Sequence, residues 1–252
     1  MNPARELPEQ KWLSRLKTAL NPPRWRKKDW FFLVAAVLAW PALIQIRPYT
    51  MTAHCTATAT HCSPEHVGRW DRIALGTELS AADAASFETQ NSAGALALAV
   101  PTLMSLGRGL VLKHPLSLIG STIGTDLLIA LETTTWNGTL NEIVRQVARR
   151  PRPFVYANLK TTGGEVGNYT SFYSGHTSFA AAITLCMILT LLGRNAPLIG
   201  VFLSGAAGYS LVFLTGLFRI LSARHFPTDV IAGALAGTLV ALWIALRHRA
   251  QD

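Results

Sequence analysis

Charged residues are scarce in this sequence. Only 15% of its 252 residues are Asp, Glu, Lys or Arg, whereas soluble domains carry about 25%. Hydrophobic residues make up 50% of the chain, and they are gathered into runs instead of recurring at helix or strand spacing. A shortage of charge together with apolar runs excludes an ordinary soluble domain and indicates a membrane protein.

Acidic residues are scarcer than basic ones, with 14 Asp and Glu against 23 Lys and Arg. A basic chain can bind nucleic acid, but here a dense group of Lys and Arg precedes the first apolar run, and no nucleic-acid-binding motif is present. Such a group beside a membrane span favours the cytoplasmic side and contacts anionic lipid. Within it, Trp12, Leu13, Leu16 and Leu20 share one helical face and predict an interfacial helix. We therefore expect membrane lipids, and no nucleic acid, as partners.

The apolar runs predict an all-α, polytopic fold, a six-transmembrane-helix bundle with a short helical loop region on its outer side. The expected spans are residues 30–46, 92–111, 115–150, 177–192, 197–218 and 227–246. The third is one long helix whose second half is polar, because no stop signal precedes Pro151. Ser80 is expected to cap a separate short helix over residues 81–89. Gly233 and Gly237 form a small-xxx-small pair that lets another helix approach closely.

The domain organisation follows from these spans. Residues 1–29 form a basic N-terminal segment, residues 30–247 the six-helix domain, and residues 248–252 a tail; within the domain lie an outer loop, 48–91, and an active-site loop, 145–176. Basic residues flank the spans at four places. With six spans, all four places lie on the same side of the membrane, and by the positive-inside rule that side is the cytoplasm. Both termini are then cytoplasmic, and both loops face outward.

Arginines are concentrated just before and within the active-site loop. Arg145 and Arg149 lie one helical turn apart, and the sequence Arg150-Pro151-Arg152-Pro153 is stiff because a residue before proline is held extended. A guanidinium matches the oxygens of a phosphate, so a bound phosphate would compensate these charges. The alternatives are lipid headgroups or pairing with Glu142.

Histidines follow in two further stretches of the predicted outer face. In "YSGH", Gly175 allows a tight turn and His176 begins a helix whose amides favour an anion, although a plain capped helix would read the same way. In "RHFPTD", His225 and Asp229 lie four residues apart, so Asp229 can reach one imidazole nitrogen and leave the other free. An ordinary cap beside an interfacial histidine is the alternative there.

Together the three stretches supply what phosphoryl transfer without a metal requires: two histidines, several arginines and an amide turn. They also resemble the signature of the type-2 phosphatidic acid phosphatases, a superfamily of membrane lipid phosphatases with soluble acid phosphatase and haloperoxidase relatives. That signature reads Lys, six residues, Arg-Pro; then Pro-Ser-Gly-His; then Ser-Arg, five residues, His, three residues, Asp. Order and spacing are intact here, with Arg145 for Lys, Tyr173 for Pro and Phe218 for Ser.

The resemblance implies a role for each matched residue. His225 would form a phosphohistidine, with Asp229 orienting it, and His176 would protonate the leaving group and then activate water. The phosphoryl group would be held by Arg145, Arg152, Ser174, Gly175 and Arg219. No cofactor or metal would be needed.

Three cysteines are too few for a disulfide scaffold. Cys55 and Cys62 lie in the outer loop, where a disulfide is the simplest interpretation and a metal site with His54, His61 and His66 is the alternative. Cys186 is expected to be an inert core thiol. Asp126 lies within a span, where it could pair with Arg108, hydrogen-bond inside the bundle or contribute to a polar path.

The sequence therefore predicts an integral-membrane hydrolase that removes phosphate from a lipid monophosphate or diphosphate at the periplasmic face of a bacterial inner membrane. Candidate substrates are a polyprenyl diphosphate, phosphatidylglycerol phosphate, phosphatidic acid or a lipid A phosphate. The rival hypotheses are a lipid phosphotransferase with an acceptor other than water, and a non-catalytic headgroup binder or transporter.

Overall fold

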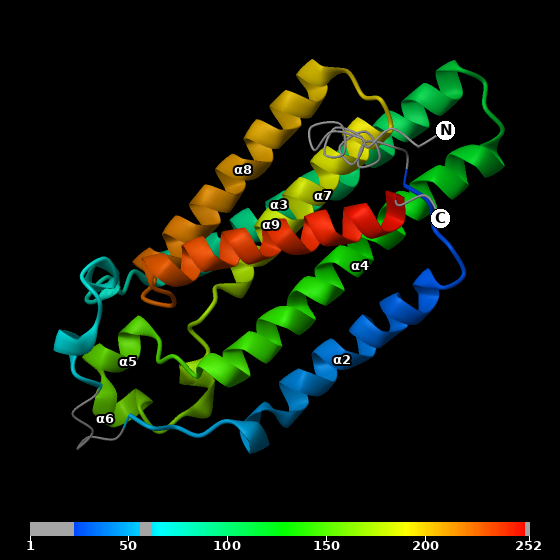
Figure 1. Cartoon of the computed structure of the whole chain (residues 1–252). Helices are drawn as coiled ribbons and strands as arrows, with labels where there is room; N and C mark the ends of the chain where they lie inside the picture. Colours follow the sequence, from blue (N-terminus) through cyan, green and yellow to red (C-terminus); the bar gives the residue numbers. More distant parts are fainter. Residues whose placement is uncertain (1–22, 56–61, 250–252) are drawn as a thin grey trace, which may run out of the picture.

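Six long helices form the protein. The computed structural model describes residues 23–55 and 62–249 (Figure 1). Each of the six helices is long and apolar enough to cross a membrane: α2 (Asp29–Thr50), α3 (Ser80–Val111), α4 (Leu116–Ala148), α7 (Gly175–Gly193), α8 (Leu198–Leu221) and α9 (Pro227–Arg249). The described residues contain no strand, so the predicted all-α six-span fold is confirmed. The predicted interfacial helix and residues 250–252 lie outside the described residues.

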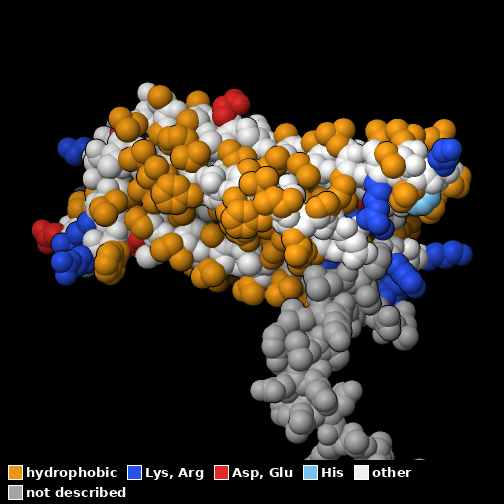
Figure 2. All heavy atoms as spheres, turned by 90° about the horizontal axis from the view of Figure 1, so that it is seen from above, with side chains coloured by type: hydrophobic (Ala, Val, Ile, Leu, Met, Phe, Trp, Pro, Cys, Tyr) orange, Lys and Arg blue, Asp and Glu red, His pale blue; other side chains and the backbone are white. Residues whose placement is uncertain are grey.

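The surface of the bundle suits a lipid environment. Large apolar side chains on the outer helices are exposed, among them Phe202 and Phe213 on α8 and Leu239 on α9. Figure 2 shows such side chains spread along the middle of the molecule, while Lys and Arg gather toward its two ends. Apolar surface on this scale is unfavourable in water and favourable against acyl chains. The protein is therefore a multi-pass membrane protein.

Helix α7 lies at the centre of the bundle, against α3, α4, α8 and α9. Its contact with α9 is close because two glycines of α9 pack against main-chain carbonyl oxygens, one of α7 itself and one of the residue that caps its start. A Cβ at Gly233 would come within 2.6 Å of the Ser174 oxygen, and one at Gly237 would overlap the Ser178 oxygen. The predicted small-xxx-small contact is thus present, and it fixes the start of α7 against the start of α9.

Two predicted boundaries differ from the structure. Residues 81–89 are not a separate helix but the first turns of α3, and Ser80 is its first helical residue while Leu79 occupies the cap position. The polar residues of this stretch are satisfied within the bundle: Ser86 donates to the Asp83 carbonyl at 2.7 Å, and Thr215 of α8 donates to Thr89 at 2.9 Å. At the other end of the chain α9 continues through Arg249, beyond the predicted tail boundary.

One end of the bundle carries the longer connections and is called the loop end here. It holds residues 51–55 and 62–79, the short helices α5 (Pro153–Ala157) and α6 (Leu159–Thr162), and the 222–226 turn. The opposite end, called the tail end, holds the 112–115 and 194–197 turns and the end of α9 (Figure 1). The chain therefore crosses the bundle in alternating directions.

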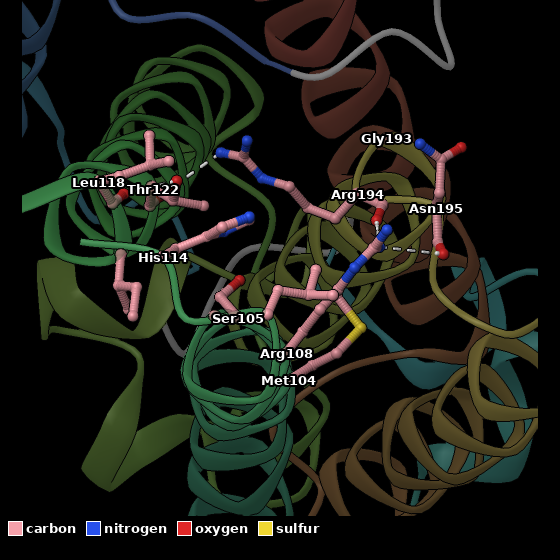
Figure 3. Close-up of a pocket in the computed structure, with 12 residues that line it drawn as sticks. Met104, Ser105, Arg108, His114, Leu118, Thr122, Gly193, Arg194 and Asn195 are labelled. Atoms are coloured by element: carbon pink, nitrogen blue, oxygen red, sulfur yellow. Dashed lines mark hydrogen bonds between the residues drawn. The ribbon is translucent and has the colours of Figure 1, made fainter. Parts of the chain in front are cut away.

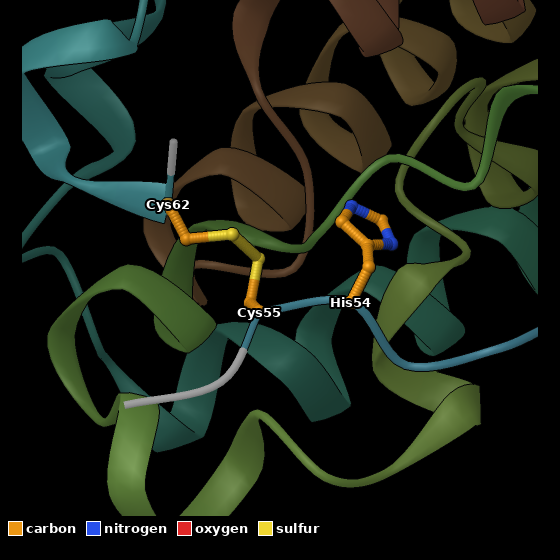
Figure 4. Close-up of side chains that lie close together, drawn as sticks. All are labelled: His54, Cys55 and Cys62. Carbon is orange, nitrogen blue, oxygen red and sulfur yellow. A yellow bond between two sulfur atoms is a disulfide. The ribbon is translucent and has the colours of Figure 1, made fainter. Parts of the chain in front are cut away.

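Cys55 and Cys62 form a disulfide at the loop end (Figure 4). His54 lies beside the two sulfur atoms, but sulfurs bonded to each other are not thiolate ligands, so the disulfide interpretation holds over the metal site. The Cys55 amide donates to the Tyr169 hydroxyl at 2.8 Å, and that hydroxyl donates to the Gly163 carbonyl at 2.5 Å. The disulfide thus anchors the outer loop to the active-site loop.

Buried ion pairs join the helices at the tail end. Arg247 contacts both Asp29 of α2 and Glu132 of α4, and His248 lies 2.8 Å from Glu132. These pairs explain why α9 continues to Arg249. Of the three alternatives for Asp126, the structure shows an ionic contact inside the bundle: it pairs with Arg194 at 2.7 Å and not with Arg108, and it thereby joins α4 to the end of α7.

Candidate active site

The three motif stretches meet at the loop end of the bundle. Arg145 lies in the last turn of α4, Arg152 immediately precedes α5, and His176 lies in the first turn of α7. Arg219 lies in the last turn of α8, and His225 lies in the turn that leads into α9. Residues up to 80 positions apart in sequence are brought together because α4 and α8 end, and α7 and α9 begin, at this end of the bundle.

A cavity of about 340 Å³ opens among these helices. Arg145, Arg152, Gly175, His176 and Arg219 line its polar part. Apolar side chains from three helices also line it: Trp40 and Ile44 of α2, Phe87 of α3 and Phe179 of α7. The cavity therefore offers a cationic region continuous with an apolar one.

Five buried nitrogens at this site have no hydrogen-bond partner among the described residues. They are Nε of Arg145, Arg152 and Arg219 and Nε2 of His176 and His225. A buried donor without a partner costs about 1–3 kcal/mol, and native proteins rarely leave several in one place. The three guanidinium Nε–H donors of this set would be satisfied by a ligand rich in acceptor oxygens, as a phosphate is.

The imidazole of His225 is held by the main chain. Its Nδ1 lies 2.6 Å from the Ser171 carbonyl oxygen, whereas the distance from Nδ1 to the nearer Asp229 oxygen is 3.9 Å. The expected direct hydrogen bond from Asp229 is therefore wrong. Because a carbonyl oxygen only accepts, Nδ1 carries the proton and Nε2 keeps its lone pair.

The surroundings keep His225 neutral. The side chain is fully buried, and burial lowers its pKa well below the ordinary value, with further lowering from the positive charges of Arg219, Arg152 and Arg145. A neutral imidazole with a free Nε2 is the form that can act as a nucleophile.

Asp229 acts on His225 through Ser171. The Ser171 hydroxyl donates to Asp229 Oδ2 at 2.5 Å, and the same oxygen accepts the Phe226 amide at 2.9 Å. The Ser171 amide donates in turn to the Arg150 carbonyl at 3.0 Å. Asp229 thereby fixes the position of the carbonyl that orients the imidazole.

Arg150 and Asp71 complete this network, and the sequence reasoning gave neither a role. Arg150 Nη1 lies 2.5 Å from Asp229 Oδ1, and its Nη2 lies 2.7 Å from Asp71 Oδ2. Asp71 also accepts the amide of Thr228 at 3.0 Å and its hydroxyl at 2.7 Å. Arg150 was visible as one of four clustered arginines, but no sequence signal separates it from those that line the cavity.

The Tyr-Ser-Gly-His turn is positioned by contacts on both sides. Gly175 leaves room for its neighbours, since a Cβ there would lie 2.8 Å from both Arg145 Nη2 and Asn141 Oδ1. Ser174 faces away from the cavity lining: its amide donates to the Asp229 carbonyl at 3.0 Å, and its hydroxyl lies 3.0 Å from that of Thr177. Burial raises the pKa of Tyr173 to about 12, so its hydroxyl stays protonated. Ser174 thus ties α7 to α9.

The arginines of the cavity are only partly neutralised. Glu142, the alternative partner for the arginine cluster, is occupied by Arg47 of α2 through two contacts of 2.6 Å, and lies 3.9 Å from Arg145. Arg219 pairs with Asp83 of α3 at 2.5 Å. Among the described residues, the Arg152 side chain donates only to the Thr170 hydroxyl, at 3.0 Å. The site therefore retains a net positive charge.

Comparison with known proteins agrees with this geometry. Residues 126–251 match the sequence model of the PAP2 superfamily. The lipid A 1-phosphatase of Porphyromonas gingivalis is 33% identical over 87 residues, which make up 34% of this chain and 18% of that protein. The chain thus spans less than a fifth of that relative's length. No solved structure matches this chain significantly. The matched region contains both histidines and all the arginines of the cavity except Arg47, and the chain belongs to the PAP2 superfamily.

Proposed function

We propose that this protein is a lipid phosphatase that hydrolyses a phosphate monoester or diphosphate of a membrane lipid through a phosphohistidine. The observation that carries the proposal is the group of five buried nitrogens without partners among the described residues; four of them belong to residues that line the cavity, and the fifth is Nε2 of His225, which is not a lining residue. Three of them belong to guanidiniums that would bind phosphoryl oxygens, and two belong to the histidines.

The first step is attack by His225. Its Nε2 lone pair forms a bond to phosphorus, and the bond from phosphorus to the leaving oxygen breaks. Protonated His176 gives its proton to that oxygen, which leaves as an alcohol or a lipid monophosphate. Arg145, Arg152 and Arg219 stabilise the charge that develops on the other phosphoryl oxygens.

The second step regenerates the enzyme. Neutral His176 removes a proton from water, the water oxygen bonds to phosphorus, and the bond between phosphorus and Nε2 breaks. Inorganic phosphate is released, and His176 is again protonated. Ser171 and Asp229 hold the imidazole of His225 through both steps.

The apolar part of the cavity supports a lipid as the substrate. The first methylene groups behind the phosphate would contact Trp40, Ile44, Phe87 and Phe179. The rest of the lipid's hydrocarbon chain would lie in the bilayer. A lipid A phosphate, a polyprenyl diphosphate, phosphatidylglycerol phosphate and phosphatidic acid all combine such a group with long chains.

The charge distribution supports a bacterial inner-membrane location with the tail end in the cytoplasm. Basic residues flank the tail end at Lys27, Lys28, Lys113, Arg194 and Arg247. The positive-inside rule then puts the loop end, with its disulfide and its histidines, in the oxidising periplasm.

Phosphate release by the detergent-purified protein, measured against a panel of these lipids in EDTA, tests the proposal. We expect release by the wild type and by the control Arg149→Ala, whose side chain donates to main-chain carbonyls alone within the described part of the chain. We expect a loss of at least about 1,000-fold in His225→Ala and about 100-fold or more in His176→Ala. Binding without release would support a headgroup binder, and phosphate on an added acceptor would support a phosphotransferase.

A further inference from the structure

A second cavity lies at the tail end of the bundle, away from His176 and His225. Its volume is about 250 Å³, and its walls come from the end of α3, the start of α4 and the end of α7. Figure 3 shows Arg108, His114 and Arg194 around the same space. The catalytic proposal uses none of these residues.

The polar lining of this cavity is basic. Arg108, His114 and Arg194 line it, and no Asp or Glu is among its lining residues. The charge of Arg194 is neutralised by Asp126 of α4, which lies 2.7 Å from its guanidinium. Arg108 is different: it donates to the main-chain carbonyls of Arg194 at 2.8 Å and Asn195 at 3.5 Å, and it forms no ion pair with a carboxylate of the described residues. The cavity therefore carries positive charge that an anion would compensate.

The lining of the cavity also includes apolar side chains. Met104, Leu112, Leu118 and Ile119 line it. Leu103, Leu110 and Leu116, close to these residues in sequence, are exposed on the lipid-facing surface. The cavity thus combines a cationic part with an apolar part that continues onto the helix surface, which is the arrangement that suits an amphiphile with an anionic head.

We propose that this cavity binds an anionic phospholipid of the surrounding membrane. The phosphodiester contacts Arg108 and His114, and the acyl chains follow the apolar surface of α3 and α4. The walls of the cavity come from α3, α4 and α7, so a lipid bound there would hold these three helices together at the tail end. At the loop end, the same helices carry Phe87, Arg145 and His176.

Native mass spectrometry of the full chain in detergent tests this site, with phosphatidylglycerol as the probe and phosphatidylcholine as the zwitterionic comparison. Lys113→Gln is the matched control, because it removes the same charge just beyond the end of α3, five positions from Arg108, and Lys113 does not line the cavity. We expect the wild type to retain phosphatidylglycerol over phosphatidylcholine. Arg108→Gln should weaken retention by about tenfold or more, and Lys113→Gln by less than about twofold.

A second variant separates loss of binding from loss of folding. Ser105→Phe places a ring in the cavity and leaves both arginines in position. It should weaken phosphatidylglycerol retention as strongly as Arg108→Gln while keeping the elution profile of the wild type. Displacement of the lipid by millimolar inorganic phosphate would show that the site takes a free phosphate instead. Equal effects of Arg108→Gln and Lys113→Gln, or no preference for the anionic lipid, would overturn the proposal.

Discussion

Replacing Arg150 by Gln is expected to destabilise the protein strongly, although Arg150 does not line the active-site cavity. Its guanidinium bridges two buried carboxylates, Asp229 at 2.5 Å and Asp71 at 2.7 Å. Removing one partner of a buried ion pair costs about 3–5 kcal/mol, because an uncompensated charge stays buried. The Arg150 side chain is 26% exposed, and both carboxylates keep other donors, so we expect about 2–4 kcal/mol.

A thermal scan in detergent measures this effect. A loss of about 2–4 kcal/mol corresponds to a fall in Tm of roughly 5–15 °C for a chain of this size. The matched control is Arg149→Gln, which removes the neighbouring arginine, whose side chain donates only to the carbonyls of Gln146 and Thr50. Its Tm should change by no more than about 2–3 °C.

A second substitution identifies the cause. In Asp71→Asn/Arg150→Gln one of the two uncompensated charges is removed, so the double variant should be less destabilised than the sum of the two single variants. Phosphate release should also fall in Arg150→Gln, mainly in kcat, because Asp229 and Ser171 then hold His225 less firmly. Equal Tm values for Arg150→Gln and Arg149→Gln would refute the reasoning.

Three further predictions concern His225 and the loop end. Ser171→Ala removes the hydroxyl that Asp229 accepts at 2.5 Å; we expect kcat to fall by about tenfold or more with KM little changed, and an equal rise in KM would contradict a positioning role. Reducing the disulfide between Cys55 and Cys62, which are 7 positions apart, removes about 2.5 kcal/mol of loop-closure stabilisation and should lower Tm by roughly 5–10 °C; an unchanged Tm would contradict this. The third concerns pH: the pKa of His225 is lowered in the folded protein, so below about pH 6.5 the unfolded chain binds a proton that the folded one does not. Stability then falls with decreasing pH by up to about 1.4 kcal/mol per unit from this group, and His225→Asn should show a shallower fall; parallel curves would contradict a neutral His225.

The six helices could be predicted from the sequence because apolar runs reflect the thickness of a membrane directly. The start of α3 could not, since Ser80 to Gln90 mixes polar and small residues, and its contacts with the bundle, from Arg219 to Asp83 and from Thr215 to Thr89, appear only in the folded chain. Motif spacing predicted which histidines and arginines would meet.

The orientation of His225 was beyond sequence reasoning for a different reason. Its partner is a main-chain carbonyl, that of Ser171, and main-chain groups carry no residue signature. The place of Asp71 depends on how the outer loop folds back over the start of α9, a contact between positions 157 residues apart. Spacing therefore located the candidate reacting groups, while the groups that orient them appeared only in the folded chain.

Trapping the covalent intermediate tests the central claim most directly. The protein is incubated with a lipid whose terminal phosphate carries ³²P, quenched in alkaline denaturant and digested, because phosphohistidine survives alkali and is lost in acid. We predict label on the peptide that contains His225 and none in His225→Ala, with more label in His176→Ala than in the wild type if dephosphorylation slows more than attack. Continued phosphate release by His225→Ala, with no label on the wild-type protein, would contradict the account.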